Sequence, residues 1–218
     1  MNAPVLTLDG PSGAGKGTVS RTVASLLGWH YLDSGSIYRA LAIAVLQAGV
    51  ALDDVAAVTD VAHGMSLAFD CDSELSVWLN GVDITLQLGT ETTGKAASIV
   101  AAYPDVRAVL LQKQKKFRQQ PGLVADGRDM GSVVFPDAQY KVYLTANAET
   151  RALRRYKQLI EKGIDANLLQ ITQEVEERDR RDRERATAPL TVPDGAIYID
   201  SSNMTIQDVI DRVTALVR

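Results

Sequence analysis

The sequence contains a single cysteine, Cys71, among its 218 residues. One cysteine cannot form a disulfide within the chain, and such usage is typical of a reducing compartment. The chain does not begin with a basic segment followed by an apolar one, and no apolar run reaches the length that spans a bilayer. We therefore expect a cytoplasmic protein that does not enter a membrane.

Signals for metal clusters and for nucleic acids are also scarce. The two histidines, His30 and His63, have no cysteines or carboxylates at metal-ligand spacing, so we expect both to be structural or surface residues. A formal net charge of −4 argues against general binding to nucleic acids or to membrane surfaces. No Asn-Lys-x-Asp motif is present, which argues against a switch GTPase.

The most informative segment is glycine-rich and lies close to the N-terminus. It follows the apolar run Val5–Leu8 and precedes apolar residues at helical spacing, so it lies between a predicted strand and a predicted helix. In that context successive main-chain N–H groups and the helix N-terminus bind phosphate. We expect phosphate to be bound by Gly10, Pro11, Ser12, Gly13, Ala14, Gly15, Lys16, Gly17 and Thr18.

Two side chains of this segment carry chemistry. Lys16 places a cation on the β and γ phosphates, and the hydroxyl of Thr18 can hold Mg²⁺. The usual pattern has Ser or Thr directly after the lysine, whereas here Gly17 intervenes, which is the form seen in nucleoside monophosphate kinases. The alternative is an ordinary glycine-rich turn. Four glycines and a lysine between a strand and a helix favour phosphate binding.

The rest of the chain alternates strands with helices. A chain of 218 residues suits one α/β domain with small inserted lobes. The alternation predicts a parallel sheet with helices on both faces. We expect further core strands at Trp29–Asp33, Leu123–Asp126, Tyr140–Leu144 and Ala196–Asp200, and helices over 37–47, 53–62, 93–102, 104–119, 149–161, 168–185 and about 206–216.

Between Ser66 and Thr85 the pattern changes to short strand candidates. They are Leu67–Phe69, Leu75–Leu79 and Val82–Ile84, and Asn80-Gly81 between the last two predicts a tight hairpin turn. This segment is too short for a separate domain, so we expect a small antiparallel lobe.

Charged residues follow two of the predicted core strands. Arg39 is predicted in the first turn of the helix after the second strand, where it could bind a second phosphate. Arg128 and Asp129 follow the strand that ends at Asp126; the arginine could bind phosphate, and the carboxylate could accept an N–H from a base. The alternatives are a solvated arginine and a turn closed by a local ion pair.

A charged helix near the C-terminus alternates in sign from Glu177 to Arg185. Its ordinary explanation is a solvated surface with local ion pairs, each of which stabilises little. Five arginines within nine positions also suit a mobile lid that neutralises a migrating phosphoryl group. Because the chain also has a predicted phosphate-binding loop, we favour the lid over the solvated surface.

Taken together and in this order, the motifs resemble those of bacterial cytidylate kinases over nearly the whole chain. They are Gly-Pro-Ser-Gly-Ala-Gly-Lys-Gly-Thr, Asp-Ser-Gly-x-Ile-Tyr-Arg, Asp-Gly-Arg-Asp-Met-Gly and Arg-Asp-x-x-Arg. The resemblance implies a three-layer P-loop NTPase fold. It also implies a single domain with a core over 1–33 and 93–218, a monophosphate-binding lobe over about 34–92 with an antiparallel insertion over about 64–88, and an arginine-rich lid over about 150–188.

The same resemblance implies a reaction and a set of site residues. The reaction would transfer the γ-phosphoryl group of ATP, with Mg²⁺, to CMP or dCMP. Lys16, Arg39, Arg128 and Arg185 would be catalytic, with Arg39 and Arg128 on the CMP phosphate. CMP would be bound by Ser34, Arg39, Ser98, Arg107, Arg128, Asp129, Arg178 and Asp182, of which Ser98, Arg107 and Asp129 read the base and Arg178 and Asp182 lie near the ribose.

Other functions stay open at this point. The chain could be a phosphate-loop kinase for another small acceptor, such as UMP or a metabolite that is not a nucleotide. It could also be a nucleotide-dependent regulatory module, which predicts slow hydrolysis and a protein partner. Cytidylate kinase activity predicts nucleotide substrates only, in a protein that we expect to be a monomer.

Overall fold

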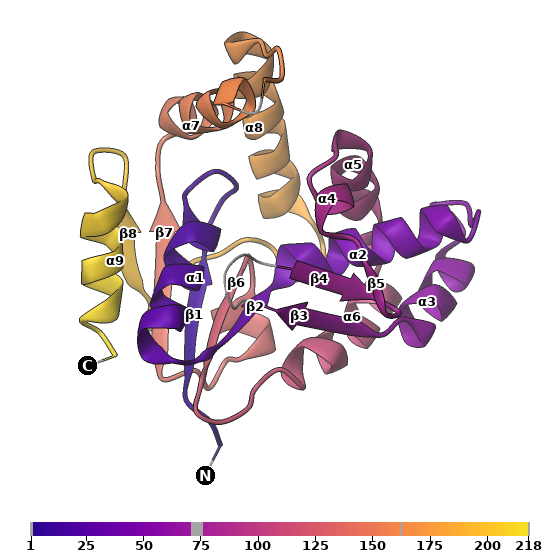
Figure 1. Ribbon diagram of the computed structural model, residues 1–218, viewed down its shortest axis with the longest axis horizontal. Helices are drawn as coiled ribbons and strands as arrows, with labels where there is room; N and C mark the ends of the chain where they lie inside the picture. The colour runs from indigo at the N-terminus through magenta and orange to yellow at the C-terminus, as the bar shows by residue number, and fades with distance from the viewer. Residues whose placement is uncertain (1, 71–75, 162, 218) are drawn as a thin grey trace.

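The structure, a computed structural model, describes residues 2–70, 76–161 and 163–217. Its centre is a five-stranded parallel sheet with the strand order β2-β6-β1-β7-β8 (Figure 1). The strands are β1 (Val5–Asp9), β2 (His30–Asp33), β6 (Leu123–Gly127), β7 (Tyr140–Thr145) and β8 (Ile197–Asp200). β1 lies between β6 and β7. From β1 the chain passes to β2 at one edge of the sheet, and from β6 it passes to β7 on the opposite side of β1, so the segment after β1 lies where the direction of the connections reverses.

Helices cover both faces of this sheet, as the sequence predicts. On one face, α1 (Lys16–Leu27) and α9 (Ile206–Thr214) pack against the sheet. On the other, α2 (Ser34–Gln47), α3 (Val55–Gly64) and α6 (Pro104–Lys115) form the larger core. Figure 1 shows α1 and α9 on the side of the sheet that bears the C-terminus.

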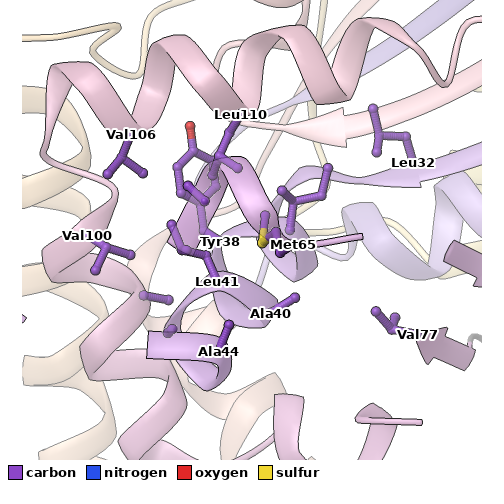
Figure 2. Packing of buried hydrophobic residues seen from close by; sticks show 14 of the residues in the cluster. Leu32, Tyr38, Ala40, Leu41, Ala44, Met65, Val77, Val100, Val106 and Leu110 are labelled. Carbon is purple, nitrogen blue, oxygen red and sulfur yellow. The ribbon is translucent and has the colours of Figure 1, made fainter. Parts of the chain in front are cut away.

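The two cores follow from alternation along the strands. In β1, Val5 packs into the core under α2 and α6, whereas Leu6 and Leu8 pack into the core under α1 and α9. Figure 2 shows the larger cluster, in which Tyr38 and Leu41 of α2 lie near Val106 and Leu110 of α6. All five residues of β1 are buried, and a strand buried on both faces is typical of a parallel sheet.

A small antiparallel sheet is inserted between α3 and the next core helices. It consists of β3 (Leu67–Asp70), β4 (Ser76–Leu79) and β5 (Val82–Asp83) in that order. The predicted hairpin is confirmed: Asn80 and Gly81 have φ angles of 51° and 80° and connect β4 to β5. Cys71 and Leu75, the first residue of one predicted strand, lie outside the described residues.

Four more helices and one helical turn complete the part of the chain that the structure describes. They are α4 (Thr85–Leu88), α5 (Glu91–Val100), the π-helical turn η1 (Met130–Val134), α7 (Ala148–Glu161) and α8 (Leu168–Glu184). The sequence analysis did not predict α4 or η1. Across the described ranges, no helix combines the length and the apolar character needed to cross a bilayer.

The start of α2 corrects the sequence prediction. The helix begins at Ser34 and not at Ile37, because the Asp33 side chain accepts a hydrogen bond from the main-chain N–H of Ser36 at 3.2 Å and caps the N-terminus. Arg39 consequently lies in the second turn of α2 and not in the first.

Candidate active site

A large cleft opens at the carboxyl edge of the parallel sheet. Its volume is about 2590 Å³, and its walls come from the glycine-rich loop, α1, α2, α5, α7, α8 and the start of α9. A pocket for one drug-sized ligand has a volume of roughly 300–1,000 Å³, so this cleft has room for two nucleotides.

The glycine-rich loop lies at the centre of the cleft. Gly13 and Gly15 have φ angles of 76° and 93°, in the left-handed region that side chains disfavour. Gly15 is the N-cap residue of α1, and because it has no side chain, no side-chain hydrogen bond caps this end of the helix. The N–H groups at the start of α1 therefore remain available to a phosphate, as the sequence predicts for such a loop.

Lys16 is the first residue of α1 and is buried. Its Nζ donates a hydrogen bond to the carbonyl oxygen of Pro11 at 2.9 Å, within the same loop. Burial, together with the cationic groups of Arg128 and Arg178, lowers the pKa of Lys16 to about 7. A bound polyphosphate would restore the charge of this lysine, because it supplies the negative charge that the site lacks.

Carboxylates of the two neighbouring strand ends flank the loop. Asp126 of β6 lies beside Asp33 of β2 in the strand register, and its Oδ2 accepts a hydrogen bond from the Tyr31 hydroxyl at 2.8 Å. Burial and the Asp33 carboxylate raise the pKa of Asp126. A Cβ built on Gly17 would lie 3.6 Å from Asp126 Oδ2, so this carboxylate reaches the phosphate loop. The sequence analysis assigned no role to Tyr31 or Asp126.

Asp9, at the end of β1, is a second buried carboxylate that the sequence analysis missed. It accepts hydrogen bonds from the main-chain N–H groups of Met130 and Gly131, both at 2.7 Å. Burial raises its pKa to about 6 despite those two bonds. Asp9 thereby holds the turn that carries Arg128 and Asp129 against the strand that leads into the phosphate loop. Its only sequence signal was a carboxylate at the end of an otherwise apolar strand.

Several arginines converge on the same cleft. Arg39, Arg128 and Arg178 all line it. Burial, followed by the neighbouring Arg128, lowers the pKa of Arg178 to about 10. Burial also lowers the pKa of Arg39, and its cationic neighbours Arg155 and Arg128 act in the same direction. Groups of like charge that are held together in a partly buried space favour an anionic ligand, since each raises the free energy of the others.

The arginine that follows β6 also has a carboxylate partner. Arg128 Nε donates to Asp182 Oδ2 of α8 at 2.6 Å. Burial alone would lower the pKa of Arg128, but Asp182 outweighs it and raises that pKa. The ion pair connects the turn after β6 to the arginine-rich helix.

Asp129 lies between two further predicted residues. It accepts a hydrogen bond from Arg107 of α6, and Arg185 Nη2 lies 3.6 Å from its second oxygen. The guanidinium group of Arg107 also lies over the ring of Tyr38, 5.6 Å from the ring centroid. The structure therefore brings three of the predicted residues into one buried cluster.

The remaining predicted residues lie around these groups. Ser98 of α5 lines the cleft. Gly94 of the same helix lies close to Arg39, because a Cβ built on this glycine would lie 3.8 Å from Arg39 Nη2. Ser34 is buried at the start of α2, while Thr18 is exposed in the first turn of α1. All the predicted residues thus lie on elements that meet at this edge of the sheet.

Comparison with known proteins identifies the family. Residues 6–218 match the family model described as cytidylate kinase. A cytidylate kinase from Methylococcus capsulatus is 55% identical over 215 residues, which cover 99% of this chain and 97% of that protein. Another, from Aeromonas salmonicida, is 54% identical over 214 residues, or 98% and 93% of the two chains. This chain belongs to the cytidylate kinase family.

The resemblance that the four motifs indicate is thus confirmed at the level of the family. Among solved structures, an uncharacterized protein from Eubacterium ventriosum matches 98% of this chain and 97% of its own, with a TM-score of 0.52 and 11% identity. That likeness shows a shared fold alone. The parallel sheet between helices and the added antiparallel sheet confirm the predicted α/β class.

Proposed function

We propose that this protein transfers the γ-phosphoryl group of ATP to CMP or dCMP and releases ADP with CDP or dCDP. Membership of the cytidylate kinase family supports the reaction. The observation that carries the proposal for this chain is the convergence of Lys16, Arg39, Arg128 and Arg178 on one cleft at the carboxyl edge of the sheet. Such a cleft suits two phosphate-bearing ligands.

On the donor side, the loop from Gly10 to Thr18 would hold the ATP phosphates through main-chain N–H groups, with Lys16 on the β and γ oxygens. The oxygen groups of Thr18, Asp33 and Asp126 suit Mg²⁺, which prefers hard oxygen donors, so the residues present fit this ion. Thr18 would hold Mg²⁺ together with the ATP phosphates. The ion would neutralise charge on the phosphates when bound.

On the acceptor side, Arg39 and Arg128 would bind the phosphate of CMP, and Arg185 would assist them. A guanidinium group can bind two phosphate oxygens at once, which fixes the acceptor in line with the donor. Arg178 and Asp182 would lie near the ribose, and Ser34 and Ser98 would contact the nucleotide. Ser34 lies on the same helix as Arg39, and Ser98 lies on α5, which packs against that helix; this supports the arrangement.

Base selection would depend on Asp129 and Arg107. Cytosine carries an amino donor where uracil has a carbonyl, next to a ring nitrogen that accepts a hydrogen bond. Asp129 would accept from the amino group, and Arg107 would donate to the ring nitrogen or the carbonyl. UMP would place an acceptor against the carboxylate, and an unpaired polar group in such a pocket costs about 1–3 kcal/mol.

The chemistry requires positioning and charge neutralisation. The acceptor is already a phosphate oxyanion, so no strong general base and no covalent enzyme intermediate are needed. Lys16 and the arginines would stabilise the charge that spreads over the phosphoryl group. We propose that residues 34–92 form a monophosphate-binding lobe and that about 150–188 form a lid, because exclusion of water prevents hydrolysis of ATP.

We further propose that the protein works as a monomer in the cytoplasm and needs no nucleic-acid partner. The net charge of −4 gives no general attraction for nucleic acids.

An acceptor panel tests the proposal. ADP release from Mg-ATP is measured with CMP, dCMP, UMP, AMP and GMP in turn, and without any acceptor. We expect CMP and dCMP to give the highest kcat/KM, with UMP at least about tenfold lower. Preference for another acceptor would replace the proposal with a different kinase activity. Slow hydrolysis that no acceptor stimulates would favour the regulatory module.

A further inference from the structure

A buried ion pair joins the two helices of the arginine-rich region. Arg151 in the first turn of α7 binds Asp179 of α8 through two hydrogen bonds, with Nη1–Oδ1 at 3.0 Å and Nη2–Oδ2 at 2.5 Å. The side chains are 3% and 6% exposed. Such a two-fold bond between planar groups fixes relative orientation as well as distance. The proposed function uses neither residue.

Arg151 also contacts the phosphate loop. The same Nη1 that binds Asp179 donates to the carbonyl oxygen of Ser12 at 3.0 Å, and Nε donates to the carbonyl oxygen of Ala146 at 2.8 Å. A Cβ built on Gly13 would lie 3.1 Å from the Cβ of Arg151, so the loop backbone packs directly on this side chain. One guanidinium group therefore touches the loop, the end of β7 and α8.

Asp179 lies among the proposed acceptor-side residues of α8. It directly follows Arg178 and precedes Asp182 by three positions, which is close to one helical turn. Below it, α8 packs on α7 through a small cluster of Ala152, Ile171 and Val175. That apolar contact is small, and the Arg151–Asp179 ion pair adds a direct polar link between this end of α8 and the loop.

We propose that the Arg151–Asp179 ion pair couples the phosphate loop to α8, so that a nucleotide bound in the loop raises the affinity of the acceptor site. Phosphate bound in the loop fixes the position of the Ser12 carbonyl oxygen. Arg151 donates to that oxygen and to Asp179, so the position of Asp179 is fixed with it. The helix then holds Arg178 and Asp182 toward the acceptor. Arg151 and Asp179 are positioning residues in this scheme, which rests on the proposed function.

A merely structural ion pair predicts a different result. It would stabilise the packing of α7 on α8, and its loss would lower the melting temperature without any change in communication between the sites. Stability therefore does not separate the two roles. The coupling between two ligands does, because it is the ratio of two affinities measured on the same folded variant.

The test measures CMP binding by calorimetry with and without saturating adenylyl imidodiphosphate, an ATP analogue that is not hydrolysed. For the natural sequence we expect the analogue to tighten CMP binding at least about fivefold. Asp179→Asn keeps the shape but removes the charge, and we expect the ratio to fall below about two. Glu176→Gln removes one charge from an exposed position of the same helix and is the matched control; its ratio should equal that of the natural sequence.

Several outcomes would overturn the coupling. A natural protein that binds CMP equally with and without the analogue has no coupling to transmit, and an unchanged ratio in Asp179→Asn assigns the pair to stability alone. If Asp179→Asn does not fold, Arg151→Lys keeps the charge and loses the forked bond, with the same expected loss. Hydrogen exchange in the natural protein is a further check: the analogue should slow exchange in 177–184, and unchanged exchange contradicts the link. Absence of CMP phosphorylation would instead reject the proposed function.

Discussion

Asp129 has two roles in the proposed site. It accepts a hydrogen bond from Arg107, and Arg185 lies close to its second oxygen. A cytosine amino group would therefore share Asp129 with these arginines. The carboxylate also neutralises buried positive charge, so its complete removal would leave Arg107 without a counter-ion, at a cost of about 3–5 kcal/mol.

Asp129→Asn tests base reading with less damage to the fold than an alanine would cause. The amide keeps the shape of the side chain but offers only one acceptor oxygen. We expect the ratio of kcat/KM for CMP to that for UMP to fall about tenfold, while KM for ATP changes less than about twofold. Steady-state kinetics with both acceptors measure the two effects.

The matched control for this variant is Asp137→Asn. Asp137 also pairs with an arginine, Arg118, at 2.7 Å, but its side chain is 60% exposed. Its replacement should leave selectivity unchanged. An equal loss of CMP and UMP turnover in Asp129→Asn, with a disturbed KM for ATP, would contradict the base-reading role.

At this scale the sequence predicts residues that belong to local motifs and misses those whose partners lie far along the chain. Lys16, Arg39 and Arg128 follow strand ends, where spacing alone indicates phosphate chemistry. Asp9 binds main-chain groups 121 and 122 positions away, and nothing near it in the sequence indicates this. Such contacts depend on how the sheet is ordered.

The elements of the fold follow their local signals closely. Gly28 ends α1 with a φ of 64°, and Thr205 with Asp208 forms a capping box at the start of α9. The sequence prediction begins α2 too late because residues 34–36 show no apolar period, although Asp33, the last residue of β2, also caps the helix. The four-residue α4 and the turn η1 were missed because neither is long enough to show a helical period.

The turn between β1 and the phosphate loop offers a test at the scale of the element. Gly10 has a φ of 149°, and a Cβ there would lie 1.9 Å from the carbonyl oxygen of Leu144 in β7. For Gly10→Ala we expect a loss of about 2–5 kcal/mol in the free energy of unfolding, from overpacking added to the disfavoured backbone angle. Urea unfolding measures this loss.

Gly28→Ala is the matched control for the glycine variant. Gly28 also has a positive φ, but a Cβ there would meet nothing within 4 Å. Its replacement should cost only about 1–2 kcal/mol, from backbone conformation alone. If the two variants lose the same stability, the close approach between β1 and β7 has no energetic consequence.

The whole molecule gathers positive charge in the cleft although its net charge is −4. Lys16, Arg39 and Arg178 have pKa values that burial and neighbouring cations lower. The parallel sheet with helices on both faces could be predicted from the alternation of elements, whereas the order of its strands and the extent of the cleft were not predicted. The ion pair between Asp182 of α8 and Arg128 in the turn after β6 could not be predicted, because a charged helix by itself predicts only a solvated surface.

This charge distribution predicts that the protein takes up protons when it binds ATP. Burial lowers the pKa of Lys16 to about 7, so the lysine is largely neutral at pH 8. A bound triphosphate raises that pKa, and it raises the pKa of Asp126 in the same direction. We expect an uptake of about 0.5–1 proton per ATP at pH 8, and less at pH 6, where Lys16 is already charged.

Calorimetry of ATP binding in two buffers of different ionisation enthalpy, without added metal, measures this uptake. Phosphate groups have their last pKa near about 6, so they are already ionised at pH 8 and contribute little. A binding heat that is the same in both buffers at pH 8 would show that Lys16 is charged before ATP arrives.

The central place of β1 in the sheet has a consequence for biosynthesis. The nucleotide-binding loop is encoded within the first eighteen residues, but its strand pairs with Leu123–Gly127 on one side and with Tyr140–Tyr143 on the other. While the ribosome is still translating the residues between that strand and Leu123, the strand has neither neighbour. The loop must therefore wait for about a hundred further residues to be synthesised before the sheet that supports it can form.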